Sequence, residues 1–176
     1  TNFLMPFGIS PNFLIDGNIF HIPMVIEESS VVAAASKSAK FWLERGGFHT
    51  KVIDTTKVGQ VHFKYFGDSE KLFNFFNLKR SSLLKSTSSL TANMEKRGGG
   101  IKDIILEDKT KAMDNYFVIN ITFNTCDAMG ANFINSVLEK VASEFELLAQ
   151  NHNSFNEVQK DIEIVMSILS NYTPQC

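Results

Sequence analysis

Cysteine is scarce in this chain of 176 residues, which contains only Cys126 and Cys176. The two have neither a CxxC spacing nor a nearby pair of histidines, so they predict neither a disulfide framework nor a zinc site. An excess of positive charge is absent too, because 17 Lys and Arg residues are set against 19 Asp and Glu residues. The net charge of -2 argues against a nucleic-acid partner, which usually needs a basic surface.

Long apolar runs are also missing. No stretch approaches the roughly 20 apolar residues of a membrane-spanning helix. The first residues, TNFLMP, lack the basic segment of a signal peptide. The four histidines are scattered without an HxxxH or HExxH spacing, so no metal site is indicated. We therefore expect a soluble, cytoplasmic protein without a membrane or metal partner.

What the chain does have is apolar material, with 44% hydrophobic residues and 16 phenylalanines. This excludes a disordered chain and is enough for one medium domain, or for a small domain with part of another. We interpret most of the phenylalanines as core filler.

The first 50 residues predict a hairpin followed by a helix. Asp16-Gly17-Asn18 separates two apolar runs, which is a hairpin signal. The stretch from Ser29 to Glu44 is rich in alanine, serine and lysine and precedes Gly46-Gly47, as expected of a helix with a glycine stop.

The rest of the chain predicts a β-α-β-β-α-β order. Alternation predicts strands at 61–65, 101–107, 117–123 and 162–168, and helical spacing predicts one helix interrupted near 79–82 and another from Gly130 onward. This order is that of an α+β, ferredoxin-like fold with an antiparallel sheet and two helices on one face. We assign residues 53–165 to this small domain, and 1–52 and 166–176 to parts of a larger domain that it interrupts.

Two glycine-containing segments are candidates for binding a ligand. Residues 125–132 connect the cleanest strand to the cleanest helix, and Asp127 is placed to cap that helix. With Gly130 allowing close approach, the exposed N–H groups would make an anion site, or the segment is only a capped turn. Gly98-Gly99-Gly100 either clears space for a dinucleotide or stops a helix.

Charged pairs leave similar alternatives. In Glu27-Glu28, at most one carboxyl is expected to face a site, where burial would raise its pKa and suit it to proton transfer. The alternative is a pair of solvated or helix-capping acids. Lys79-Arg80 and Lys96-Arg97 are either solvated surface or contacts for a phosphate.

Four segments in order carry a resemblance to a known family. They are PMVIEESSVVAAAS (23–36), GGF (46–48), DAMGAN (127–132) and LSN (169–171). Together they resemble 3-hydroxy-3-methylglutaryl-coenzyme A (HMG-CoA) reductase of the bacterial, class II type. In that family the small domain that binds the nicotinamide dinucleotide is an insertion with a ferredoxin-like fold.

The resemblance implies roles for particular residues. Glu28 matches the acid that acts in reducing the thioester of HMG-CoA, through mevaldehyde, to mevalonate and CoA, and Ser30 matches a serine that contacts the substrate. The dinucleotide-binding turn matches Asp127, Ala128, Met129, Gly130, Ala131 and Asn132. Asn171 matches an asparagine beside the nicotinamide.

The cofactor implied is NADPH or NADH, and we favour NADPH. Some family members place an aspartate that selects NADH where this chain has Thr91. Without that carboxylate to repel a 2'-phosphate, and with Lys96 and Arg97 nearby, NADPH becomes acceptable. The resemblance also implies a homodimer, because the family builds its active site between subunits.

The family's catalytic lysine, aspartate and histidine would lie beyond Cys176. Because hydride transfer to a thioester needs a group that stabilises the oxyanion and a group that protonates the thiolate, we expect the 176-residue chain to be an inactive fragment of an enzyme. The alternative from another class is a non-enzymatic dinucleotide-binding or interaction module of ferredoxin-like fold.

Overall fold

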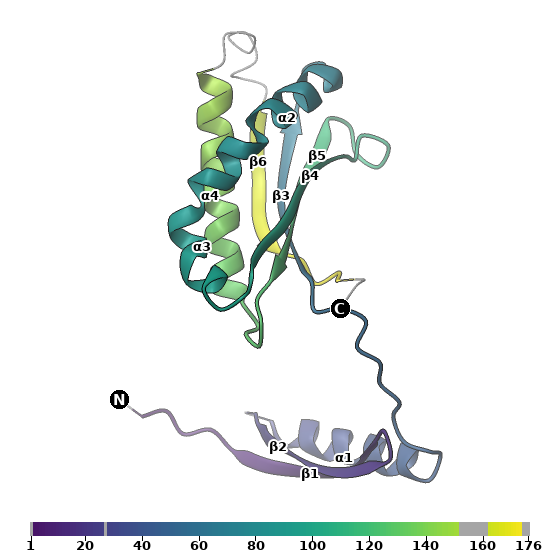
Figure 1. The fold of residues 1–176 in the computed structure, drawn as a ribbon. Helices are drawn as coiled ribbons and strands as arrows, with labels where there is room; N and C mark the ends of the chain where they lie inside the picture. The colour runs from purple at the N-terminus through teal and green to yellow at the C-terminus, as the bar shows by residue number, and fades with distance from the viewer. Residues whose placement is uncertain (1, 27, 152–161, 174–176) are drawn as a thin grey trace. The chain divides into compact units, whose positions relative to one another are not determined.

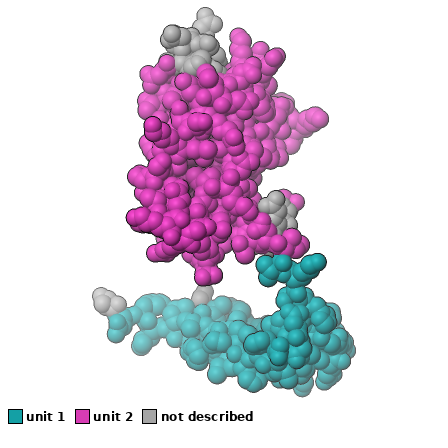
Figure 2. Space-filling view, in the orientation of Figure 1, with its two compact units in different colours: residues 1–52 teal, residues 53–176 magenta. Residues whose placement is uncertain are grey.

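The computed structural model describes every residue except 1, 27, 152–161 and 174–176. The chain divides into two compact units, residues 1–52 and residues 53–176, which Figure 2 colours separately. The division falls between residues 52 and 53.

Unit 1 is a hairpin covered by one helix. Strands β1 (Phe7–Ile15) and β2 (Asn18–Val25) pair antiparallel, and the turn between them has positive φ at Asp16 and Gly17. Two successive positive φ angles match the right-handed twist of a two-residue hairpin, which is why Asp-Gly predicts it. Helix α1 (Ser29–Leu43) packs on β1, and its chain continues through Gly46 and Gly47, both with positive φ. The predicted hairpin, helix and glycine stop are confirmed.

Unit 2 is a four-stranded antiparallel sheet with helices on one face (Figure 1). Its elements are β3 (Lys57–Tyr65), α2 (Ser69–Ser86), α3 (Ser88–Glu95), β4 (Gly100–Asp108), β5 (Tyr116–Asn124), α4 (Ala131–Gln150) and β6 (Ile162–Leu169). The strand order is β4-β5-β3-β6, and every neighbouring pair is antiparallel. The four predicted strands and the helix after Gly130 are confirmed.

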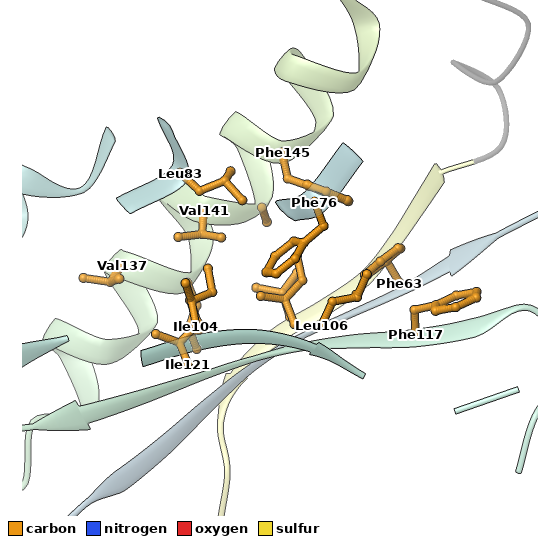
Figure 3. Close-up of a cluster of buried hydrophobic side chains, with 14 of the residues drawn as sticks. Phe63, Phe76, Leu83, Ile104, Leu106, Phe117, Ile121, Val137, Val141 and Phe145 are labelled. Carbon is orange, nitrogen blue, oxygen red and sulfur yellow. The ribbon is translucent and has the colours of Figure 1, made fainter. Parts of the chain in front are cut away.

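The core of unit 2 lies between the helices and the sheet (Figure 3). Alternate residues of β3 and β5 point into it, including Phe63, Phe117 and Phe123, each almost completely buried. Phe145 of α4 packs against Phe63, with 5.3 Å between the ring centroids. Several phenylalanines are thus core residues, although others, such as Phe3 and Phe7 in unit 1, are exposed.

The predicted helix interruption is misplaced. Helix α2 runs unbroken through 79–82, and the break falls at Thr87, between α2 and α3. There the side chains of Ser86, Thr87 and Ser88 donate hydrogen bonds to the carbonyls of Leu83, Leu84 and Lys85. Hydroxyl groups that bond to nearby backbone carbonyls compete with the helix and bend it, so three in succession favour a break at this point.

The predicted boundary between residues 165 and 166 cuts through a strand. β6 continues to Leu169, which pairs with Gly59 of β3, and the Ser170 amide still donates to the Val58 carbonyl at 2.8 Å. Residues 166–170 therefore belong to the sheet of unit 2. The alternation of Ile162, Ile164 and Ile168 predicted the strand, but alternation alone does not say which sheet a strand joins.

Candidate functional site

Glu28 and Ser30 lie at the start of α1 in unit 1. Glu28 is the residue before the helix, and the Ser30 hydroxyl donates a hydrogen bond to its carboxylate. Both residues are exposed in unit 1. The burial that we expected for one carboxyl of the Glu27-Glu28 pair is therefore not supplied to Glu28 by the described residues of this unit. Glu27, the other acid of the pair, lies outside the described residues.

The segment from Thr125 to Asn132 forms a tight turn between β5 and α4. Thr125 is buried, and its hydroxyl donates to the Ala128 carbonyl at 2.6 Å, while the Ala128 amide donates back to the Thr125 carbonyl at 3.0 Å. Asp127, Ala128 and Met129 are exposed at the tip. The predicted turn is thus present, with three of its residues accessible to a ligand.

Asp127 does not cap α4, contrary to our expectation. The helix begins at Ala131, its N-cap is Gly130 in the left-handed conformation with φ 82°, and no side chain caps it. Asp127 lies three residues before the N-cap position, because the hydrogen bonds between Thr125 and Ala128 form a turn before the helix begins. The first N–H groups of an α-helix have no partner within the helix, so those of α4 remain available at the positive end of its dipole.

The glycine triplet stops a helix and allows two loops to meet. Gly98 has φ 88° and lies three residues after the end of α3 at Glu95. A Cβ at Gly99 would lie 2.5 Å from the Asn124 carbonyl oxygen and 3.1 Å from the Cys126 sulfur, so only glycine permits this approach. The Cys126 thiol in turn donates to the Arg97 carbonyl at 3.3 Å. This contact brings the exposed Lys96-Arg97 pair beside the turn before α4.

Thr91 lies in α3. It is 2% exposed, and its hydroxyl donates to the Ser88 carbonyl in its own helix. It lines a groove together with Arg80 and Lys102. The carboxylates of Glu95 and Asp103 line the same groove, so the absence of a carboxylate at position 91 does not leave the groove free of negative charge.

The predicted turn residues 127–132 and Asn171 lie at one end of the sheet, where β3 begins. Lys57 begins β3 and pairs with Phe123 near the end of β5, two residues before Thr125. Asn171 is exposed and follows Ser170, whose amide bonds to Val58 beside Lys57. The turn, the start of β3 and the segment after β6 therefore share one end of the sheet, whereas Glu28 and Ser30 belong to unit 1.

Lys57 is a residue of this site that the sequence analysis missed. Its ammonium group donates to the Thr125 hydroxyl at 2.8 Å and to the Ala128 carbonyl at 3.3 Å. Its two acceptors are 68 and 71 positions away in the chain. Only the antiparallel pairing of β3 with β5 brings them together, so no local spacing signalled this contact.

A second polar cluster lies in the segment that leads into β3. Asp54 accepts hydrogen bonds from the Thr56 hydroxyl at 2.7 Å and from the Lys102 ammonium at 3.1 Å. The Thr56 bond, followed by those from Lys102 and the Thr55 amide, lowers the pKa of Asp54 from 3.8 to about 2. These bonds join the entry of β3 to β4.

This cluster predicts a pH dependence on the acid side. Because the pKa of Asp54 is lower when folded, its stabilising bonds are fully present above pH 3.8 and are lost as the pH falls toward about 2. Thr56→Val removes the largest cause, so the pKa of Asp54 should rise toward 3.8. A carboxyl-carbon NMR titration measures it, and a wild-type pKa near 3.8 would contradict the cluster.

Neither a metal site nor a membrane span emerges from the described residues. Within them no group of three or more His, Cys, Asp or Glu side chains could hold a metal ion, and His152 lies outside them. The Nδ1 atom of His62 lies 3.1 Å from the Tyr116 hydroxyl oxygen, and burial lowers the pKa of this histidine. No helix in the described part of the chain is both long enough and apolar enough to cross a membrane.

Two solved structures of one bacterial protein are similar to this chain. The 3-hydroxy-3-methylglutaryl-coenzyme A reductase of Streptococcus pneumoniae is 32% identical, with a TM-score of 0.69 over 99% of this chain and 38% of that one. The class II reductase of the same organism, bound to NADPH in open conformations, is 31% identical, with a TM-score of 0.70 over 99% of this chain and 44% of that one. The likeness extends over nearly the whole of this chain and less than half of each of those two chains.

The sequence comparisons agree. A 3-hydroxy-3-methylglutaryl-coenzyme A reductase of Archaeoglobus fulgidus is 37% identical over 145 residues, which are 82% of this chain and 33% of that protein. The profile of the family described as hydroxymethylglutaryl-coenzyme A reductase matches residues 1–176. The chain belongs to the hydroxymethylglutaryl-coenzyme A reductase family. It spans about a third of the length of the curated relatives that it matches.

Proposed function

We propose that this chain is part of an enzyme that reduces HMG-CoA to mevalonate and CoA with two molecules of a reduced nicotinamide dinucleotide. The observation that carries the proposal is the family match over residues 1–176, joined to an exposed turn before the uncapped helix α4. We propose that the 176 residues by themselves do not catalyse this reaction, because they span about a third of the length of the curated relatives.

The proposed roles follow the family resemblance residue by residue. Glu28 supplies a proton during reduction, and Ser30, bonded to its carboxylate, contacts the substrate. Asp127 to Asn132 form the dinucleotide-binding turn, and Asn171 lies beside the nicotinamide. The position of Asn171 at the same end of the sheet as the turn supports their sharing one ligand.

The chain from residue 53 to the end of β6 is proposed to be a ferredoxin-like dinucleotide-binding domain, which extends the expected range of 53–165 to the end of that strand. The order β4-β5-β3-β6, with helices between β3 and β4 and between β5 and β6, is the split β-α-β order and supports this assignment. Residues 1–52 and the chain after β6 would belong to the substrate domain. A homodimer in the cytoplasm is proposed on the resemblance and on the low cysteine content.

NADPH is the favoured cofactor, with NADH as the alternative. The support for NADPH is the similar structure that is bound to it, together with the exposed Lys96-Arg97 pair beside the turn. Thr91 gives less support than the sequence suggested, because it is buried and shares its groove with two carboxylates.

A calorimetric titration of the full 176-residue chain with NADPH, and separately with NADH, tests this proposal. We expect saturable binding, tighter for NADPH, that Asp127→Ala weakens roughly tenfold, since an exposed carboxylate at the turn can accept a hydrogen bond from a cofactor hydroxyl. Asp114→Ala, which removes an exposed acid from the loop between β4 and β5, is the matched control and should bind as the wild type does. Absence of saturable binding to either nucleotide would contradict the proposal.

A further inference from the structure

We propose that Lys57 both holds the turn before α4 in shape and contacts the phosphate groups of the dinucleotide that binds there. This inference rests on the proposed function, because it concerns the same turn. It assigns a task to a residue that neither the motifs nor the resemblance singled out.

The Lys57 ammonium group donates to neutral acceptors. Lys57 is half-buried, and its two acceptors, the Thr125 hydroxyl and the Ala128 carbonyl, are both neutral. Within the described residues it has no carboxylate partner, whereas Arg80, Lys102, Lys109 and Lys140 each pair with one. A cation whose acceptors are all neutral keeps its full attraction for an anion beside it.

The Lys57 ammonium group also has one more N–H donor than it uses at the turn. A lysine ammonium group carries three N–H donors. Two are used at the turn, and the third has no partner in the part of the chain that the structure describes. The third donor therefore remains for an oxygen of a ligand that binds against the turn.

Hydrogen bonds and close packing through Thr125 connect Lys57 to the start of α4. The Thr125 hydroxyl accepts from Lys57 and donates to the Ala128 carbonyl, so the three groups form one closed set of hydrogen bonds. Thr125 in turn lies directly against Gly130, where an added Cβ would be 2.5 Å from its Cγ2. Lys57 thus fixes Thr125, Thr125 fits against Gly130, and Gly130 is the N-cap that orients the first N–H groups of α4.

The ligand chemistry follows from these two features together. The N-terminus of a 20-residue helix offers backbone donors and a partial positive charge, and Lys57 offers a full charge on the adjacent side of the turn. This combination fits a phosphate or diphosphate group, which is the anionic centre of the nicotinamide dinucleotides.

The experiment measures the Kd for NADPH of the full 176-residue chain and of its variants by calorimetry over a range of salt concentrations. Lys57→Met keeps the apolar stem and removes the charge and the donors. We expect the Kd to rise by about tenfold or more, and its dependence on salt to become shallower. Lys57→Arg should recover most of the affinity, a rescue that a merely space-filling role would not give. Lys140→Met removes a charge from the exposed face of α4 and should leave the Kd unchanged.

A second variant covers the possibility that Lys57→Met fails to fold. Thr125→Val keeps the shape of the side chain but removes the hydroxyl that accepts from Lys57, and it should also raise the Kd. The inference is overturned if Lys57→Met or Thr125→Val folds and binds NADPH within about twofold of a wild type that binds. A wild type that binds no NADPH overturns the proposed function, and the inference with it, so the two failures are distinguishable.

Discussion

Replacing Phe145 with alanine is expected to lower the free energy of unfolding by about 3–5 kcal/mol, the usual cost of removing a buried phenylalanine ring. Phe145 is completely buried in α4 and lies between β3 and α2 (Figure 3). Its ring centroid is 5.3 Å from that of Phe63 and 5.7 Å from that of Phe75. Removing the ring therefore leaves a cavity at the contact between the helices and the sheet.

Urea denaturation followed by circular dichroism measures this loss. Leu147→Ala is the matched control, because Leu147 is on the same helix but half exposed, and it should cost less than about 1 kcal/mol. Equal losses for the two variants would mean that the helix contributes through its backbone and not through the Phe145 contact.

Replacing Gly130 with alanine is expected to damage the turn and the start of α4 together. Its φ of 82° is unfavourable for any residue with a Cβ, at about 1–2 kcal/mol. The new Cβ would also lie 2.5 Å from Thr125 Cγ2 and 2.9 Å from Thr125 Cβ, so Thr125 must move. We expect a total loss of at least about 2 kcal/mol in unfolding free energy. A weaker affinity for NADPH should accompany it.

Gly98→Ala separates the two causes. Gly98 has a similar φ of 88°, but an added Cβ there meets nothing within 4 Å. It should therefore cost only the conformational penalty of about 1–2 kcal/mol, and less than Gly130→Ala costs. If both variants lower the free energy of unfolding equally, the contact between Gly130 and Thr125 contributes nothing to stability. Thr125 would then not connect Lys57 to the start of α4, contrary to the proposal.

The sequence predicted best those elements whose pattern is local. The alternation of Phe117, Ile119, Ile121 and Phe123 fixed β5, and the apolar stripe from Ile134 to Phe145 fixed α4, because each faces one core. The same strand and helix bracket the DAMGAN segment, so its place between them was predictable as well.

What could not be predicted depends on competition or on distant contacts. The cap on α4 was assigned to Asp127 from residue type, but Thr125 closes the turn first and leaves Gly130 at the helix start. The break at Thr87 depends on three hydroxyl groups that bond to carbonyls. Lys57 reaches the turn only across the sheet, and Thr91 proves to be buried only once α3 is packed.

We propose that the nicotinamide dinucleotide binds at the turn from Thr125 to Asn132. To test this, the backbone amide signals of the nitrogen-15-labelled chain are followed as NADPH is added. We expect saturable shifts at Cys126–Phe133 and at Gly98 and Gly99, whose loop contacts Cys126. Lys64 and Tyr65, at the opposite end of β3, should not shift. Saturable shifts confined to that opposite end, or to the groove lined by Thr91, would contradict the claim.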